Sequence, residues 1–325
     1  MQLFCGCVAL LAMAIAYIPD ARSAQAAPAA PVLQFRPFVA TPLPLDAIAW
    51  SGSAFVYGGE AKRMLMTSSA TGQQLRQLVS LPRNGGEIRC VTSPGMHGFA
   101  ADAVYCHTAN AEIYRIGTDH TPHLLARLPT NSTTDGALAF DNVGAFGYAL
   151  LAASGGSTTT GGAVYAVASS GQVRQIGAYT GPGGAENLAI APAGFGPAAG
   201  QVLISVDQVN QHGRLLAMNA QGKVRVLLSS LANGLNPLVV ITGVRQSGGQ
   251  GPAPGLYLAE WISRRVLFAP AAELRAFVGD VLVGTEHGGQ LIVVRPSGSG
   301  YQFIQVQSSL RTSRVYLEGA TFIGA

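Results

Sequence analysis

The sequence predicts an all-β protein, a six-bladed β-propeller with four-stranded antiparallel blades, and three observations support this. Charged residues make up only 11% of the 325 residues and glycine occurs 41 times, which is typical of a chain with many strands and turns. Apolar runs of four to eight residues, bounded by Gly, Pro, Asn or Ser, follow one another along the chain and indicate short strands. The first four groups of such runs begin about 41 to 51 residues apart, which is the spacing of propeller blades.

Each group opens with an apolar run that follows a turn-rich stretch, and this run is the expected innermost strand of a blade. Six such runs occur in the chain: LDAIAW (45–50), GEIRCV (86–91), DGALAFD (135–141), AENLAI (185–190), LNPLVVITG (235–243) and LEGATFI (317–323). A second, a third and usually a fourth run follow. In the fourth group these are GQVLISVD (200–207), GRLLAMN (213–219) and KVRVLLSS (223–230). Four short strands per group predict one blade per group.

The two ends of the chain predict how the ring closes. The segment 280–307 supplies three strands of the last blade, and LEGATFIGA at the end of the chain supplies its missing innermost strand. A terminal strand that completes an open blade removes exposed strand edges. In the fifth blade, which combines 235–243 with the runs near 255–261 and 264–270, the fourth strand is poorly marked near AELRAF (272–277). A ring of seven blades that uses VLQFRPF (32–38) as an extra strand is the alternative.

The N-terminal segment predicts export. LFCGCVALLAMAIAYI (3–18) is apolar, and ARSAQA (21–26) offers small residues before a cleavage point. No basic residue precedes the apolar run, so an uncleaved anchor is the alternative. We therefore expect a signal peptide at 1–26, a leader at 27–40 and a propeller domain at 41–325, in the periplasm or outside the cell, with no transmembrane segment after cleavage.

Cysteine usage agrees with export. Cys5 and Cys7 lie within the expected signal, which leaves Cys90 and Cys106 in the mature chain. Two cysteines in an exported domain are expected to form a disulfide. They fall on the first and second strands of the second blade, which antiparallel pairing brings close together. Closing a loop of about 17 residues adds roughly 3 kcal/mol in the chain-entropy model.

The runs DGALAFD, AENLAIAPAGFG and LEGATFI resemble the inner-strand pattern of secreted six-bladed propellers, namely NHL-type proteins and the SMP-30/gluconolactonase/strictosidine-synthase-like group. The resemblance lies at the level of the repeat and covers most of residues 40–325. It implies the fold, whereas propellers serve many unrelated functions. In the lactonases of this group a divalent metal lies in the central channel on Glu, Asn and Asp side chains. The full ligand set of that group has no match in this sequence.

Aligning the repeats places polar residues at one position in five of the six blades. When Leu188 is set against Ile48, Leu238 and Ala320, the same column, two residues earlier, holds an acid or an amide. Its members are Asp46, Glu87, Glu186, Asn236 and Glu318. In the third blade the column holds Gly136, and Asp135 comes one place earlier. Because these positions precede the inner strands, they converge at one mouth of the axial channel.

Carboxylate and amide oxygens are the ligands that Ca²⁺ prefers, so the column predicts a metal site at the channel mouth with Ca²⁺ as its ion and no other cofactor. The alternative is structural, because Asp, Asn and Glu before a strand also cap turns and accept hydrogen bonds from backbone N–H groups. His212 and His287 follow second strands beside Asp207 and Glu286, and we interpret them as solvated loop residues.

These observations favour an exported propeller that binds a small molecule or a protein partner at one face of the ring, with no catalysis established. The alternative is a divalent-metal-dependent hydrolase of the lactonase or esterase type, in which the metal at the channel mouth polarises a carbonyl or activates water. Twenty basic residues stand against 16 acidic ones, but they are scattered. We therefore expect no nucleic-acid partner, which would need a basic face.

Overall fold

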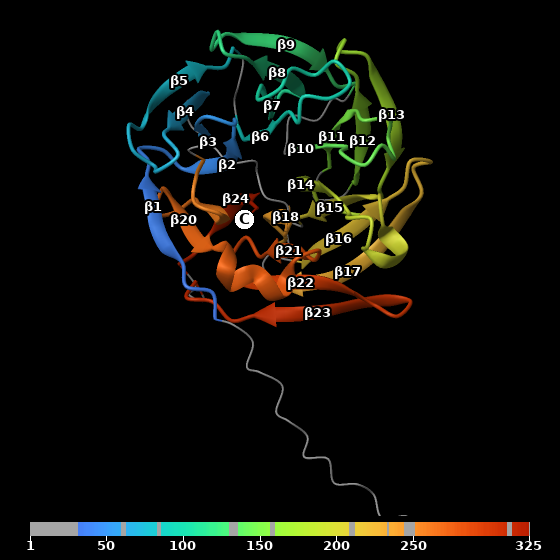
Figure 1. Cartoon of the computed structure of the whole chain (residues 1–325). Helices are drawn as coiled ribbons and strands as arrows, with labels where there is room; N and C mark the ends of the chain where they lie inside the picture. Colours follow the sequence, from blue (N-terminus) through green and yellow to red (C-terminus); the bar gives the residue numbers. More distant parts are fainter. Residues whose placement is uncertain are drawn as a thin grey trace, which may run out of the picture. The chain divides into compact units, whose positions relative to one another are not determined.

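The structure is a computed structural model that describes residues 32–59, 63–82, 86–129, 136–156, 160–207, 212–232, 234–243, 251–310 and 314–324. The residues from Pro31 onward form one compact unit. Its strands are arranged in six four-stranded antiparallel sheets around a common axis, which confirms the six-bladed propeller (Figure 1). The expected signal peptide lies outside the described residues.

The first four blades each use consecutive strands, and the first strand of each is the innermost. Blade one contains β2 (Leu45–Trp50), β3 (Phe55–Gly59), β4 (Met64–Ser68) and β5 (Arg76–Ser80). Blade two contains β6 (Ile88–Thr92), β7 (Val104–Thr108), β8 (Glu112–Ile116) and β9 (Pro122–Arg127). Blade three contains β10 (Gly136–Phe140), β11 (Leu150–Gly155), β12 (Gly162–Val167) and β13 (Val173–Ala178). Blade four contains β14 (Ala185–Ile190), β15 (Val202–Val206), β16 (His212–Met218) and β17 (Val224–Ala232).

The last two blades differ from the predicted assignment. Blade five contains β18 (Leu238–Val240), β21 (Val281–Gly284), β22 (Leu291–Ser297) and β23 (Gly300–Val306). Blade six contains β24 (Leu317–Ile323), β19 (Gly255–Glu260), β20 (Arg265–Pro270) and β1 (Arg36–Ala40). The C-terminal strand does close the ring, but it pairs with β19 and not with β21. The prediction was wrong here because it assumed that consecutive strands pair. The apolar pattern of a strand does not specify which strand lies beside it.

The N-terminal boundary of the propeller also differs from the prediction. Residues 27–40 were expected to be a leader, but β1 pairs with β20 as the outermost strand of blade six. Leu33, just before it, is fully buried. The segment considered as the seed of a seventh blade is therefore the fourth strand of the sixth, and both ends of the ring-forming chain meet in one blade. The short 3-10 helix η3 (Ala271–Phe277) occupies the place where a poorly marked fourth strand was expected.

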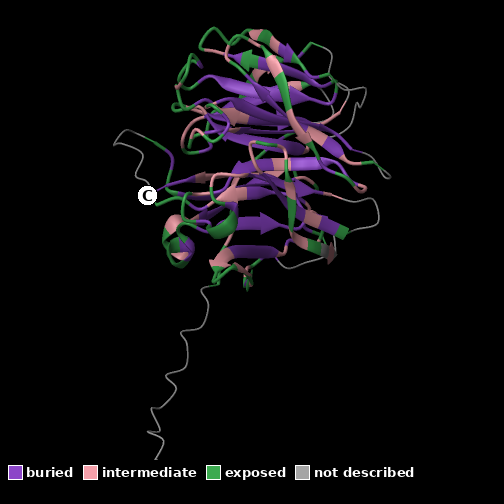
Figure 2. Ribbon diagram, turned by 90° about the vertical axis from the view of Figure 1, so that its right-hand side faces the viewer, coloured by how far each residue is buried: buried purple, intermediate pink, exposed green. Residues whose placement is uncertain are grey.

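The hydrophobic core lies between the blades. Each of the six gaps between neighbouring blades holds its own cluster of buried apolar side chains. Buried residues accordingly fill the strands, whereas exposed residues are concentrated in the loops and outer strands (Figure 2). Alternating apolar side chains on both faces of each sheet produce this arrangement, because every blade packs against two neighbours. The central axis is lined by side chains of the six inner strands.

The predicted disulfide is confirmed. Cys90 on β6 and Cys106 on β7 are directly paired across the two strands and are bonded to each other. Within the described residues, no helix has both the length and the apolar character needed to span a bilayer.

Candidate functional site

The structure brings the predicted polar column together at one end of the axis. Carboxylate oxygens of Glu87, Glu186 and Glu318 lie within 4.8 Å of one another. The Nδ2 atom of Asn236 donates to Glu318 Oε2 at 2.6 Å and to Glu186 Oε2 at 3.3 Å. Asp46 Oδ2 accepts a hydrogen bond from the backbone N–H of Ile88 at 3.3 Å, which is the structural role weighed for such residues. We call these five residues the axial ring.

Sequence reasoning missed the central member of this site, Arg89. Its Nη2 atom lies 2.9 Å from Glu87 Oε2, 2.6 Å from Glu186 Oε2 and 2.9 Å from Glu318 Oε2. Its Nη1 atom donates to the backbone carbonyl of Asp46. Glu87 and Arg89 stand two positions apart around the start of β6, and side chains at i and i+2 of a strand point to the same face. That spacing was the signal that could have identified the pair.

The axial ring is buried except for the partly exposed Glu87, and the ring and Arg89 together carry more negative than positive charge. Arg89 is 3% exposed, Glu186 4% and Glu318 3%, so these charges are largely shielded from water. Burial alone would lower the pKa of Arg89, but the carboxyl groups around it raise that pKa well above its ordinary value. Burial raises the pKa of Glu318 well above its usual range; Arg89 opposes this, and Glu87 and Asp46 add to it. One guanidinium therefore does not neutralise the surrounding carboxyl groups, and the pKa of Glu318 stays raised.

The residues as they lie do not fit a calcium ion. Ca²⁺ needs six to eight oxygen ligands at about 2.3–2.6 Å, and here a guanidinium nitrogen already lies among the three glutamate oxygens. An ion at this point would have to displace Arg89. The assignment of the five ring residues as metal ligands therefore stays a prediction.

Among the described residues, blade three contributes no acidic side chain to the axial ring. At Gly136 a side chain would overlap the imidazole of His107, which fills this place in the ring column. His107 lies directly across β6 and β7 from Arg89, is 1% exposed, and its Nε2 atom has no hydrogen-bond partner. Burial, with a smaller contribution from Arg89, lowers the pKa of His107 to about 4. The imidazole is therefore neutral at physiological pH. Asp135 lies outside the described residues.

A second group of acidic residues lies at the same mouth but is more accessible. Asp207 follows β15, and Glu286 follows β21; their carboxyl groups are hydrogen-bonded to each other. The hydroxyl of Tyr316 donates to Glu286 Oε1. Gly234 (φ +69°) leaves room for both carboxyl groups, because a side chain there would overlap Asp207 and crowd Glu286. We call Asp207, Glu286 and Tyr316 the outer layer.

The outer layer differs from the ring in its surroundings. Burial, followed by the charge of Asp207, raises the pKa of Glu286 to about 7. Two aromatic rings adjoin Tyr316: Trp261 at 5.5 Å between ring centroids and His287 at 4.4 Å. Glu286 and Tyr316 are partly exposed and His287 is exposed. His287 is a loop residue as predicted, but the carboxyl group beside it is hydrogen-bonded to that of Asp207 and has a raised pKa, which sequence reasoning did not recognise.

Below the ring the axis is narrow. A cavity of about 60 Å³ lies among residues of the six inner strands. Leu138, Leu188 and Leu238 are among the side chains that line it. This space is too small for an ordinary metabolite, since ligand pockets measure about 300–1,000 Å³. A ligand would therefore contact the mouth and not the interior of the channel.

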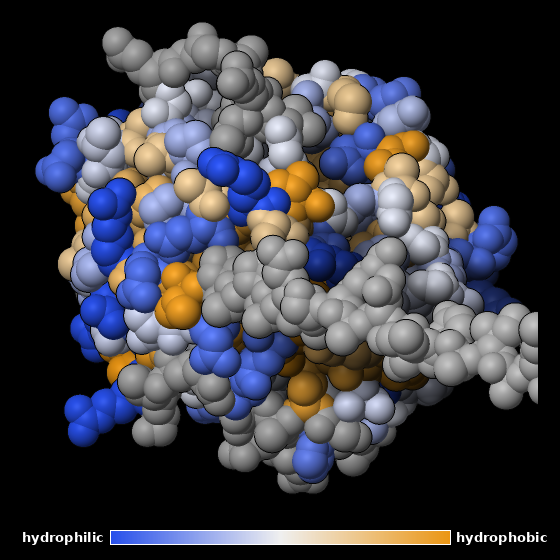
Figure 3. Space-filling model, turned by 60° about the horizontal axis from the view of Figure 1, so that its bottom comes forward, coloured by the Kyte–Doolittle hydropathy of each residue, from blue (hydrophilic) through white to orange (hydrophobic). Residues whose placement is uncertain are grey.

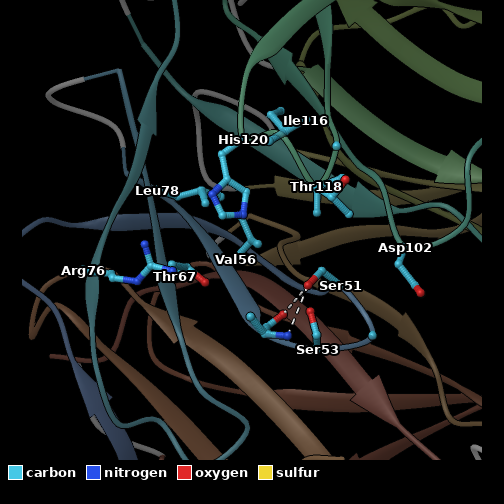
Figure 4. Close-up of a pocket in the computed structure, with 14 residues that line it drawn as sticks. Ser51, Ser53, Val56, Thr67, Arg76, Leu78, Asp102, Ile116, Thr118 and His120 are labelled. Carbon is cyan, nitrogen blue, oxygen red and sulfur yellow. Dashed lines mark hydrogen bonds between the residues drawn. The ribbon is translucent and has the colours of Figure 1, made fainter.

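A larger groove of about 320 Å³ lies between blades one and two (Figure 4). Val56, Val104 and Ile116 form its apolar floor, and Arg76 and His120 stand at its edge. The loop at 51–54, which follows the far end of β2, lines this groove, so the groove lies away from the mouth at which β2 begins. It contains no member of the axial ring or the outer layer.

Comparisons with known proteins support the fold. The chain matches no known protein-family profile and no curated protein sequence. Its structure is similar to one from a nidogen/laminin complex, with a TM-score of 0.54 and 10% identity over 86% of this chain and 85% of the other. It is also similar to a candidate gluconolactonase, with a TM-score of 0.52 and 13% identity over 90% and 86% of the two chains. A periplasmic gluconolactonase of Pseudomonas aeruginosa matches with a TM-score of 0.48 and 14% identity over 86% and 73%.

The six blades define the protein as a six-bladed β-propeller, and the two likenesses with TM-scores above 0.5 agree with this fold; at such low identity they show the fold alone. The predicted resemblance to secreted propellers is confirmed at that level.

Proposed function

We propose that the protein is an exported recognition propeller that binds a positively charged group of a ligand or protein partner at the axial mouth, through the outer layer. The observation that carries this proposal is the Asp207–Glu286 pair, which is partly exposed and shares a proton above a ring that already holds surplus negative charge. A cation that replaces the shared proton relieves the repulsion between the two carboxyl groups.

The neighbouring side chains favour an amine or guanidinium over other cations. Trp261 and Tyr316 present aromatic rings beside the pair, and organic cations are attracted to aromatic faces. The chain as a whole has a formal charge of +4, so cation binding here would reflect local and not overall charge. On the face in Figure 3, hydrophobic residues lie in small groups among hydrophilic ones, which favours a polar partner on that face.

Calorimetric titration with spermidine, as a simple organic cation, tests the proposal. We expect binding at low salt to strengthen as the pH rises from 6 to 8, because Glu286 then loses its proton. A double variant, Asp207→Asn with Glu286→Gln, should bind at least tenfold more weakly. Asp102→Asn is the matched control, since Asp102 is an exposed acid in the groove away from the mouth. Equal affinity in the double variant and the wild type would refute the proposal.

Export is supported by the disulfide, because disulfides persist in oxidising compartments, and by the apolar N-terminal segment of the sequence. Fractionation of cells that produce the full chain, followed by N-terminal sequencing, tests this. We expect the protein outside the cytoplasm with its first residue near position 27. A cytoplasmic protein with an intact N-terminus would contradict export.

The metal-dependent lactonase remains the alternative function. Its support is the shared fold with a candidate gluconolactonase, but the position of Arg89 among the acidic residues speaks against a metal at the predicted point. Hydrolysis of glucono-δ-lactone by the purified protein, abolished by a chelator and restored by Ca²⁺, would favour this alternative over recognition.

A further inference from the structure

We propose that the guanidinium of Arg89 is a tethered cation that stands where a divalent ion would otherwise neutralise the axial ring, and that replacing Arg89 with an uncharged residue turns the ring into a calcium site. The inference concerns the buried ring and does not depend on what the outer layer binds.

The geometry of the contacts is that of a central ion. Arginine usually pairs with a carboxylate through two nitrogens and two oxygens. Here a single nitrogen, Arg89 Nη2, lies within 2.6–2.9 Å of three carboxylate oxygens. The three oxygens come from three different blades, and each belongs to a residue at the start of an inner strand or just before it. Nη2 thus joins blades two, four and six at one point.

The attachment of Arg89 to the chain explains why it would exclude a free ion. A bound ion loses translational freedom, whereas a side chain fixed to a strand has lost most of that freedom on folding. β6 is held firmly here, since the disulfide joins Cys90 and Cys106, the pair next to Arg89 and His107 in the register of β6 and β7. The guanidinium is therefore already in place when a metal ion would arrive.

Removal of the guanidinium would leave three carboxylate groups facing one point. The oxygens of Glu87, Glu186 and Glu318 lie within 4.8 Å of one another, and the Asn236 side chain contacts two of these residues. Buried carboxylates without a counter-charge are strongly unfavourable, so the emptied ring would take up protons or a cation. Clustered carboxylate oxygens suit a hard ion such as Ca²⁺, whereas the Asn236 amide turns its Nδ2 toward them and its Oδ1 toward Asn187.

The first measurement uses the wild-type protein. We expect elemental analysis of the purified full chain to find less than about 0.1 equivalents of any divalent metal, and we expect its melting temperature to be the same in 5 mM EDTA and in 5 mM CaCl₂. One equivalent of a chelatable metal in the wild-type protein would overturn the proposal, because the ring would then hold an ion as well as Arg89.

The second measurement uses Arg89→Ala. Calcium at 100 times its dissociation constant should raise the melting temperature of this variant by about 5 °C. Arg89→Lys is the matched control: it keeps a tethered cation and should show no calcium response. The double variant Arg89→Ala with Glu318→Gln should lose at least half of the shift.

A second neutral variant keeps the test decisive in case Arg89→Ala folds poorly. Arg89→Gln, a larger neutral residue, is made in parallel. Folding of either neutral variant only when calcium is present supports the proposal. A folded neutral variant that is indifferent to calcium overturns it, and so does failure of both neutral variants to fold in calcium.

Discussion

Two groups of acidic residues lie at the same mouth of the propeller, and the repulsion between their negative charges is reduced in different ways. In the axial ring, Glu186 and Glu318 are buried and surround the guanidinium of Arg89. In the outer layer, Asp207 and Glu286 are hydrogen-bonded to each other, the pKa of Glu286 is raised to about 7, and both residues remain partly exposed beside Tyr316. The ring carries its cation within the chain, whereas we propose that the outer layer exchanges a proton for a cation from solution.

This difference indicates which of the two groups is suited to a ligand-dependent function. A buried cluster with its own counter-charge stabilises one arrangement of the inner strands. A partly exposed pair whose pKa lies near neutrality can change its charge and its partner under physiological conditions. Four substitutions separate these roles.

Replacing Arg89 with leucine should produce the largest effect. In a chelator at pH 7, Arg89→Leu should lower the free energy of unfolding by about 3–5 kcal/mol, because breaking a buried charge network leaves uncompensated carboxylates. Urea denaturation followed by circular dichroism measures this. Arg225→Leu, at an exposed position on β17, should stay within about 0.5 kcal/mol of the wild type. A loss below about 1 kcal/mol for Arg89→Leu would mean that the ring does not depend on its arginine.

His107 beside the ring should give an acid-side effect. Its pKa in the folded protein, about 4, lies below the value of roughly 6.5 in the unfolded chain. Between these values the unfolded chain binds the proton and the folded protein does not, so stability is lost as the pH falls from 6.5 to 4, by at most about 3 kcal/mol. His107→Leu should remove this loss in denaturation curves recorded across that range. His212→Leu, at an exposed position, should follow the wild type; if His107→Leu does so too, the histidine is not buried as described.

Glu286 in the outer layer should give the opposite pH dependence. Its pKa is raised to about 7 in the folded protein, so the folded protein holds a proton that the unfolded chain releases near pH 4.5. Stability therefore falls as the pH rises from about 4.5 to 7, by about 1–2 kcal/mol once partial exposure is allowed for. Glu286→Gln should flatten this slope, whereas Asp102→Asn should keep it. An unchanged slope in Glu286→Gln would show that the pair does not share a proton.

Glu318→Gln should have the smallest effect. Burial raises the pKa of Glu318 well above its usual value, so the uncharged amide resembles the state that the ring favours. We expect a loss of less than about 1 kcal/mol at pH 7, measured by the same urea denaturation. A loss comparable to that of Arg89→Leu would show that Glu318 is fully ionised and that the ring holds no proton.

Much of this arrangement could be predicted from the sequence because it depends on short periods. The apolar runs locate the strands, their spacing gives six blades, and the alignment of inner strands brings Asp46, Glu87, Glu186, Asn236 and Glu318 to one mouth. The pairing of Cys90 with Cys106 follows from adjacent antiparallel strands. Each of these inferences needs only the strand period and the repeat length.

Other features could not be predicted in this way, because they join residues far apart in sequence without a periodic signal. Asp207 and Glu286 lie in loops of blades four and five, and neither loop sequence contains a pattern that predicts their contact. Their carboxyl groups come into contact only because both lie beside Gly234, where a larger residue would overlap them.

The strands, the number of blades and the polar column at the mouth follow from the amino-acid sequence, since local periodicity and repeat length specify them. That β24 pairs with β19, that β1 forms the outer strand of blade six, and that Arg89 lies among the acidic residues of the column follows only from the folded structure. The physical reason is the same in each case: the strands present similar apolar faces, and their pairing and the burial of their charges are decided by the packing of the whole ring.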